Sequence, residues 1–152
     1  MAMSWLGAEV VATDVHEGRR KLLEETVSRA APEVRVVPES EIGDSGPYSA
    51  VWVDAPCSGS GILRRHPDVR WSRPDFDLRP LRETQSRLLR EALSIVPRGG
   101  LVLYSVCSLF SEEGSDVVRE STDLAEIREE IRLGPDRSPS CDGFFGAILE
   151  KR

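Results

Sequence analysis

The feature that most constrains the fold of this chain is the alternation of short apolar runs with segments of helical periodicity. Apolar residues recur at helical spacing in 16–30 and 78–96, and the second segment ends at Pro97 before Gly99 and Gly100, a common helix stop. Runs rich in β-branched and other apolar residues predict strands at 8–14, 34–37, 50–54, 100–105 and 144–151. Strands that alternate with helices predict an α/β domain with a mainly parallel sheet.

Two further segments have weaker signals for secondary structure. Ser111 is followed by Glu112 and Glu113, which predicts a helix N-cap with acidic residues in the first turn, where the helix dipole favours them. Residues 124–133 fit the periodicity of a helix, but they fit an edge strand as well.

Length and cysteine content favour an ordinary reduced protein. The chain has 152 residues, which predicts one domain over 1–152 that is large enough to bury a core. No apolar run approaches the roughly 20 residues that span a bilayer, and no signal-peptide pattern occurs, so we expect a cytoplasmic protein. The cysteines Cys57, Cys107 and Cys141 are odd in number and lack CxxC spacing, so we expect reduced thiols rather than a disulfide framework.

The charge of the chain is unevenly distributed. The net charge of −6 weakly opposes binding to nucleic acid, because phosphate contacts need clustered Lys and Arg. However, residues 62–90 contain eight arginines and four acids, a local charge of +4, whereas residues 111–130 contain eight acids and two arginines, a local charge of −6. One face of the protein could therefore be basic, although solvated helix surfaces would also explain both runs.

Polar residues gather where the predicted strands end. Asp14 ends the first strand, Asp54 and Cys57 follow the third, and Cys107 follows the fourth. Ligands of parallel α/β sheets bind outside the carboxyl ends of the strands, and neighbouring strands lie about 4.8 Å apart. The third and fourth strands are expected to be neighbours, so both cysteines are predicted to face one small pocket.

The residues alone leave alternatives open at this edge. Asp14 could accept hydrogen bonds from the ribose of an adenosine-containing cofactor, or it could cap the helix over 16–30; its position favours the two equally. A cysteine near an acid can be a nucleophile or a small buried apolar residue. A zinc site of Cys57, Cys107 and His66 lacks paired-ligand spacing, and Cys141 is expected to be structural.

Four motifs, in order and spacing, resemble those of RNA cytosine-5 methyltransferases, and most closely the Sun-type branch of enzymes similar to ribosomal RNA small-subunit methyltransferase B. They are "DAPCSGSG" (54–61), "RRHPDVRW" (64–71), "YSVCSLFSEEG" (104–114) and "DGFFGAILEKR" (142–152). The resemblance covers nearly the whole chain from Ala8. It implies a Rossmann-like fold with helices on both faces of the sheet, S-adenosylmethionine as cofactor and ribosomal RNA as partner.

The resemblance also implies roles for individual residues. Cys107 would be the thiol that adds to carbon 6 of cytosine, and Cys57 would act in releasing the product. Asp54 would hold the edge of the cytosine, and Pro56 would shape the turn. Ser58, Gly59 and Gly61 would let backbone approach the flipped base.

Further roles concern the cofactor and the RNA. Asp14 corresponds to the ribose-binding acid of the family, and Asp54 and Pro56 are also expected to line the cofactor site. Arg64, Arg65 and His66 would lie beside the RNA strand, with the arginines on phosphates. For Trp71 we expect packing within the protein, and stacking on a base is the alternative.

The chain departs from the family pattern upstream. It contains no glycine-rich "PGGKT"-like cofactor loop. We also expect the family's first strand and first helix to be missing. In the family's sheet that strand would lie between the strands that end here at Asp14 and Asp54. No acid for the adenine is clearly present after the strand predicted at 34–37, where only Glu39 or Ser40 lies nearby, and Val106 replaces a threonine. We expect the family's amino-terminal RNA-binding domain to be missing as well. The chain is therefore either an enzyme completed by a second chain or an upstream segment, or a catalytically silent module that folds or binds. A thiol-based redox or metal site is the third class.

Overall fold

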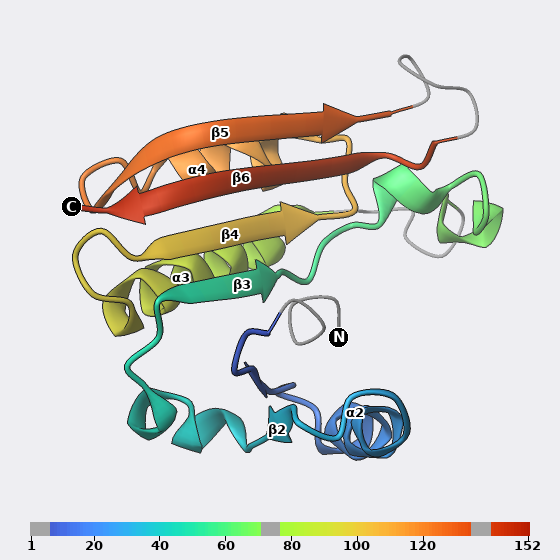
Figure 1. The fold of residues 1–152 in the computed structure, drawn as a ribbon. Helices are drawn as coiled ribbons and strands as arrows, with labels where there is room; N and C mark the ends of the chain where they lie inside the picture. Colours follow the sequence, from blue (N-terminus) through green and yellow to red (C-terminus); the bar gives the residue numbers. More distant parts are fainter. Residues whose placement is uncertain (1–6, 71–76, 135–140) are drawn as a thin grey trace. The chain divides into compact units, whose positions relative to one another are not determined.

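The computed structural model describes residues 7–70, 77–134 and 141–152 (Figure 1). The chain forms two compact units, Met1–Pro47 and Tyr48–Arg152, and each unit is described here by itself.

The first unit contains a short βαβ arrangement. Strands β1 (Val11–Ala12) and β2 (Arg35–Val36) pair in parallel, and helix α2 (Glu17–Ala30) connects them. Val27 of α2, Ala31 and Val34 are buried together, with half-buried apolar residues of the two strands packed against them. The strands are shorter than predicted, because only the pairs Val11↔Arg35 and Ala12↔Val36 share a ladder.

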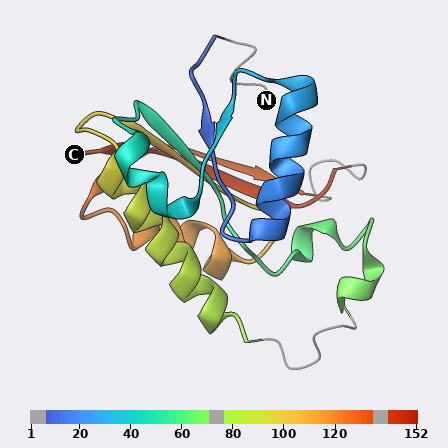
Figure 2. The same cartoon turned by 90° about the horizontal axis from the view of Figure 1, so that it is seen from below.

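The second unit is a four-stranded sheet in the order β3-β4-β6-β5. Its elements are β3 (Ala50–Asp54), α3 (Arg79–Ile95), β4 (Leu101–Val106), α4 (Ser115–Arg119), β5 (Ala125–Leu133) and β6 (Phe144–Lys151). Strands β3 and β4 are parallel, and β6 runs antiparallel to both β4 and β5. Helices α3 and α4 lie along one face of this sheet (Figures 1 and 2).

The core of the second unit explains the alternating pattern of its strands. Val102, Tyr104 and Val106 of β4 are fully buried, whereas Leu101 and Leu103 on the other face are not. The buried residues pack with alternate residues of β6 against apolar side chains of the two helices: Phe145, Ala147, Leu149, Leu89, Ala92, Leu93, Val117 and Val118. Successive side chains of a strand point to opposite faces of the sheet, so burial of Val102, Tyr104 and Val106 shows which face of β4 packs against the helices.

Most of the predicted elements are confirmed. The strands predicted at 50–54 and 144–151 have these bounds in the structure, and the strand predicted at 100–105 lies one residue later. The ambiguous segment 124–133 forms strand β5 and pairs with β6. The α/β fold class is confirmed.

The prediction of a helix N-cap at Ser111 is wrong. Residues Ser111–Glu113 form a 3₁₀ turn, and α4 begins only at Ser115, with Gly114 before it and no side-chain cap hydrogen bond. The physical reason is that Glu113 turns inward to hydrogen-bond partners in the sheet's carboxyl-end loops, so its side chain does not serve an exposed first helical turn.

The sheet topology bears on the family strand expected to be missing. Strands β1 and β2 form a sheet of their own, and β3 is hydrogen-bonded to β4 on one side. Within the described ranges, no strand pairs with the other edge of β3.

Among the same residues, no helix is both long enough and apolar enough to cross a bilayer.

Candidate active site

Two cysteines meet where strands β3 and β4 end. The strands are in parallel register, with Asp54 opposite Ser105, so the loops that follow them start side by side. The Sγ atoms of Cys57 and Cys107 lie 3.2 Å apart and share a hydrogen bond. Both cysteines are half-buried, and neither is in a disulfide. The structure thus brings together the two thiols that the spacing of the sequence places at one edge.

Backbone hydrogen bonds fix the two cysteine loops to one another. Gly61 N donates to Cys107 O at 3.0 Å, and Gly143 N donates to Gly61 O at 2.8 Å. A Cβ atom on Gly61 would lie only 2.1 Å from Gly143 O and 2.9 Å from Cys107 O, far inside contact distance. Gly61 is therefore required by close packing of the backbone beside the thiols.

Asp54 lies at the carboxyl end of β3 with an exposed side chain. Trp52 Nε1 donates to Ser105 Oγ at 2.9 Å, and Ser105 Oγ donates to Asp54 Oδ1 at 3.2 Å. A hydroxyl that accepts from the indole has its proton available for the carboxylate, so this relay orients Asp54 from the neighbouring strand.

The shared hydrogen bond separates the acidities of the two thiols. The hydrogen bond from Cys57 lowers the pKa of Cys107 to about 7, against burial and the negative charges of Asp54 and Glu113. The same hydrogen bond raises the pKa of Cys57 strongly, and burial adds to this effect. Above a pH of about 7 the pair therefore carries its proton on Cys57 and its negative charge on Cys107, and the thiolate is the nucleophilic form of cysteine.

A buried carboxylate lies behind the thiols. Glu113 has no exposed surface, and its oxygens accept hydrogen bonds from Ser58 N at 2.8 Å and Gln85 Nε2 at 3.2 Å. The hydroxyls of Ser58 and Ser108 also donate to it, each at 2.5 Å. A buried carboxylate is stable only when its acceptor sites are satisfied, as they are here.

Sequence reasoning missed this carboxylate, because two acids after a serine are typical of a first helical turn. A signal was nevertheless present. Cys57 and Cys107 are each followed directly by a serine, Ser58 and Ser108, and Glu113 comes five residues after the second serine. Such a repeat of hydroxyl donors near an acid can indicate a shared acceptor.

Asp14 lies in the first unit, just beyond the end of β1. Its Oδ1 atom accepts a hydrogen bond from His16 N at 2.8 Å, and Arg19 Nε lies 3.0 Å from its Oδ2 atom. Arg20 in turn donates to the Asp14 backbone carbonyl. The helix-start contact and the ion pair hold the Asp14 carboxylate in one orientation, with part of its side chain exposed.

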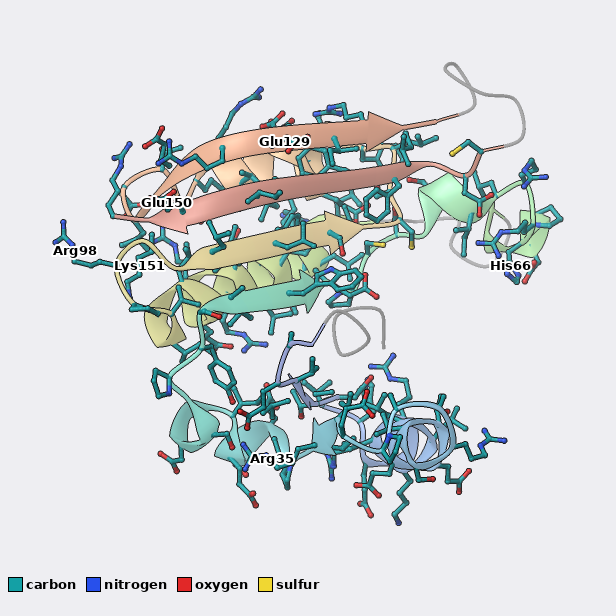
Figure 3. All side chains as sticks on the ribbon, in the orientation of Figure 1. Arg35, His66, Arg98, Glu129, Glu150 and Lys151 are labelled. Carbon is teal, nitrogen blue, oxygen red and sulfur yellow. The ribbon has the colours of Figure 1, made fainter. Side chains whose placement is uncertain are left out.

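The predicted RNA-binding residues lie beyond the carboxyl end of β3. Arg64 and Arg65 both face Asp142, with closest ion-pair distances of 3.6 Å and 2.5 Å. His66 is exposed and lies at the end of the sheet opposite to Lys151 (Figure 3). The prediction for Trp71 lies outside the described residues.

The described residues offer no group of three or more His, Cys, Asp or Glu side chains arranged to hold a metal ion. Cys141 donates through Sγ to the Asp142 backbone carbonyl at 3.3 Å.

Comparison with solved structures defines the class of the fold. The protein PH0851 matches with a TM-score of 0.85 and 28% identity, over 95% of this chain and 37% of that chain. A methyltransferase homolog protein from Pyrococcus horikoshii matches with a TM-score of 0.68 and 27% identity, over 93% of this chain and 53% of that chain. The fold is that of the Rossmann-like S-adenosylmethionine-dependent methyltransferases.

Sequence comparison then gives the family. The family model described as 16S rRNA methyltransferase RsmB/F matches residues 2–149. Ribosomal RNA small subunit methyltransferase B of Yersinia enterocolitica is 32% identical in an alignment 158 residues long, and the alignment covers 94% of this chain. The chain belongs to the 16S rRNA methyltransferase RsmB/F family, and it spans 37% of the length of that relative.

Proposed function

We propose that this chain carries the catalytic thiols of an S-adenosylmethionine-dependent methyltransferase that modifies carbon 5 of cytosine in ribosomal RNA. The proposal is supported above all by the 3.2 Å contact between Cys57 and Cys107, in which the pKa of Cys107 is lowered. Family membership supports methyl transfer to ribosomal RNA, and that substrate would place the activity in the cytoplasm.

The chemistry of the substrate explains the need for a thiolate. Carbon 5 of cytosine is a weak nucleophile until a group adds to carbon 6. In the proposed reaction the Cys107 thiolate forms a bond to carbon 6, and the electron pair displaced from the ring double bond makes carbon 5 nucleophilic. Carbon 5 then takes the methyl group that the cofactor would supply from its sulfonium, which would be left as a thioether. A base removes the proton from carbon 5, and the electron pair of that C–H bond re-forms the ring double bond and expels the thiolate.

Cys57 is suited to the last of these steps. Its pKa is raised, so it remains a thiol and keeps a proton directed at the sulfur of Cys107. The hydrogen bond that lowers the pKa of Cys107 also makes Cys107 a better leaving group, because it stabilises the departing thiolate. We therefore assign addition to Cys107 and product release to Cys57.

Asp54 would hold the cytosine edge. The Ser105 hydroxyl donates to one of its oxygens, and Asp54 is exposed at the carboxyl end of β3, so a ligand can reach its carboxylate. Holding two reacting groups in a well-oriented geometry can lower a reaction barrier by about 7–11 kcal/mol, so the position of the ring relative to the nucleophile matters.

The residues that would hold the cofactor fit an adenosine-containing ligand. S-adenosylmethionine supplies an electrophilic methyl group when it is bound. Asp14 presents a carboxylate that Arg19 and His16 N already orient, as an acceptor of ribose hydroxyls requires. Asp54 and Pro56, at the mouth of β3, are the other residues we assign to cofactor binding.

The RNA would pass beside Arg64, Arg65 and His66. Asp142 neutralises part of the charge of the two arginines, and their side chains are more than half exposed, so an RNA phosphate could compete for them. Ion pairs at such exposed positions contribute little to stability, about 0–1 kcal/mol, which makes the exchange of partners inexpensive.

The alternative is a catalytically silent module that folds or binds without methyl transfer. It is favoured by the separate two-stranded sheet of β1 and β2 and by the edge of β3 that no described strand covers. Incubation with methyl-labelled S-adenosylmethionine and a 16S rRNA fragment separates the two. The proposed function predicts label in 5-methylcytidine, whereas the absence of transfer, together with the absence of cofactor-binding heat in calorimetry, would establish the silent module.

A further inference from the structure

Glu113 is a buried carboxylate for which the proposed reaction has no direct use. Its Oε1 atom accepts from Ser58 N and Gln85 Nε2, and its Oε2 atom accepts from the hydroxyls of Ser58 and Ser108. All four contacts place a donor on the carboxylate. An ionised carboxylate is an acceptor at every lone pair, so it matches this set of partners without conflict.

The two serines connect the carboxylate to the two thiols. Ser58 directly follows Cys57, and Ser108 directly follows Cys107. Both hydroxyls donate to the same atom, Oε2 of Glu113, at 2.5 Å. One oxygen atom therefore holds both cysteine loops, whose Sγ atoms lie 3.2 Å apart.

The surrounding hydrogen bonds are compatible with donation from Ser108 to the carboxylate. Ser108 Oγ accepts from Phe110 N at 3.1 Å and can accept from the Ser60 hydroxyl at 3.0 Å. Ser60 Oγ in turn accepts from Leu109 N at 2.9 Å. The acceptor sites of Ser108 are thus supplied, and its proton is left for the carboxylate. If Glu113 were replaced by glutamine, the carboxamide would direct an N–H group at Ser108 Oγ, which already accepts from other donors.

Two further contacts anchor this carboxylate to the core of the unit. Gln85 of α3 donates through Nε2 to Pro56 O at 2.8 Å as well as to the carboxylate. The hydroxyl of Tyr104, a fully buried residue of β4, donates to the Glu113 backbone carbonyl at 2.6 Å. Glu113 is therefore attached to rigid elements on one side and to the thiol loops on the other, which is the arrangement that supports a precise site.

We propose that Glu113 is a positioning residue that holds the loops of Cys57 and Cys107 at the separation at which one thiol hydrogen-bonds the other. The inference rests on the proposed function in so far as Cys107 is taken as the nucleophile. The geometry that it concerns can be measured without RNA or cofactor.

The proposal makes a prediction opposite in sign to that of a simple charge effect. The groups that act on the thiol of Cys107 are the Cys57 hydrogen bond, which lowers its pKa, and Asp54 and Glu113, whose negative charges raise it. If Glu113 acted only as a nearby charge, its removal would lower the pKa of Cys107. If Glu113 holds the thiols together, its removal weakens the lowering hydrogen bond, and the pKa of Cys107 rises.

The experiment measures the pH dependence of alkylation of Cys107 by iodoacetamide in the whole chain, with the modified peptide quantified by mass spectrometry. For Glu113→Gln we expect the midpoint to rise from about 7 by at least about one pH unit, towards that of an ordinary cysteine. A midpoint that stays the same or falls would overturn the proposal. Glu112→Gln changes the exposed neighbouring acid and is expected to leave the midpoint unchanged.

A second variant covers the case in which Glu113→Gln does not fold. The double change Ser58→Ala and Ser108→Ala keeps the buried charge but removes both hydroxyl donors, and it is expected to raise the midpoint as well. An unchanged midpoint in the folded double variant contradicts the positioning role. A raised midpoint in a chain whose wild type forms no adduct with RNA would instead contradict the proposed function and leave the positioning role standing.

Discussion

Cys57 and Cys107 are 50 residues apart in the sequence, and their Sγ atoms share a hydrogen bond of 3.2 Å across the ends of two parallel strands. This bond gives the two thiols different acidities, because it stabilises a negative charge on Cys107 and a proton on Cys57. The division of roles that we propose, with Cys107 as nucleophile and Cys57 as releasing group, rests on the position of this one proton.

The Cys57 hydrogen bond can be tested by its removal. In Cys57→Ala the stabilising donor is lost, so the pKa of Cys107 is expected to rise from about 7 towards the ordinary value of 9.0. The thiolate would then form only at higher pH, and alkylation of the Cys107 peptide, followed against pH by mass spectrometry, should shift upward accordingly. Cys141→Ala, which removes a thiol held by a backbone carbonyl, is the control and should leave the profile of Cys107 unchanged. If the alkylation profile of Cys107 did not shift in Cys57→Ala, the low pKa of Cys107 would have a cause other than the Cys57 hydrogen bond.

Gly61 tests the packing of the cysteine loops. A methyl group at this position would lie 2.1 Å from Gly143 O, and backbone on both sides limits relaxation. We expect Gly61→Ala to lower the free energy of unfolding by about 3 kcal/mol, at the upper end for overpacked sites. Urea unfolding followed by circular dichroism measures this change.

Gly18→Ala is the matched control for this substitution. Gly18 lies in α2, and nothing lies within 4 Å of an added Cβ atom. Alanine in a helix is favoured over glycine by about 0.5–1 kcal/mol, so the control should have a small effect of opposite sign. A Gly61→Ala protein as stable as the wild type would show that the two loops can separate at little cost.

The basic residues beyond β3 make a prediction about salt dependence. If Arg64 and Arg65 contact phosphates, the double alanine variant should bind RNA more weakly at low salt, and the dependence of the logarithm of affinity on that of salt concentration should become shallower by about one to two units. Arg128→Ala, which removes an exposed arginine paired with Glu126 and Glu150 on the far strands, is the control. Filter binding at several salt concentrations gives both slopes, and equal slopes would place the RNA elsewhere.

The sequence was sufficient for those parts of the fold where burial is periodic and local. The bounds of β3 and β6 follow from alternating apolar residues such as Val51 and Val53, which pack on one face. Segment 124–133 is ambiguous in the sequence because Ile127 and Ile131 fit the spacing of a helix while the same run fits an edge strand, and the ladder with β6 decides for a strand. That ladder joins residues whose contact depends on tertiary structure, which single-sequence patterns do not contain.

The site shows the same division between local and tertiary information. The meeting of Cys57 and Cys107 could be predicted, because strand order and the rule for carboxyl ends bring them to one edge. Glu113 could not be recognised in the same way, since its partners Ser58 and Gln85 lie 55 and 28 residues away. Local propensity assigns such an acid to a helix start, and a buried network overrides that preference.

The most direct test of the assigned roles is covalent trapping on RNA that contains 5-fluorocytidine, in the presence of S-adenosylmethionine. A base cannot remove fluorine from carbon 5 as it removes a proton, so elimination is blocked, the thiol that has added to carbon 6 stays attached, and the adduct is visible on a denaturing gel. The account predicts an adduct with the wild-type chain and with Cys57→Ser, and none with Cys107→Ser. An adduct that survives in Cys107→Ser and disappears in Cys57→Ser would contradict it.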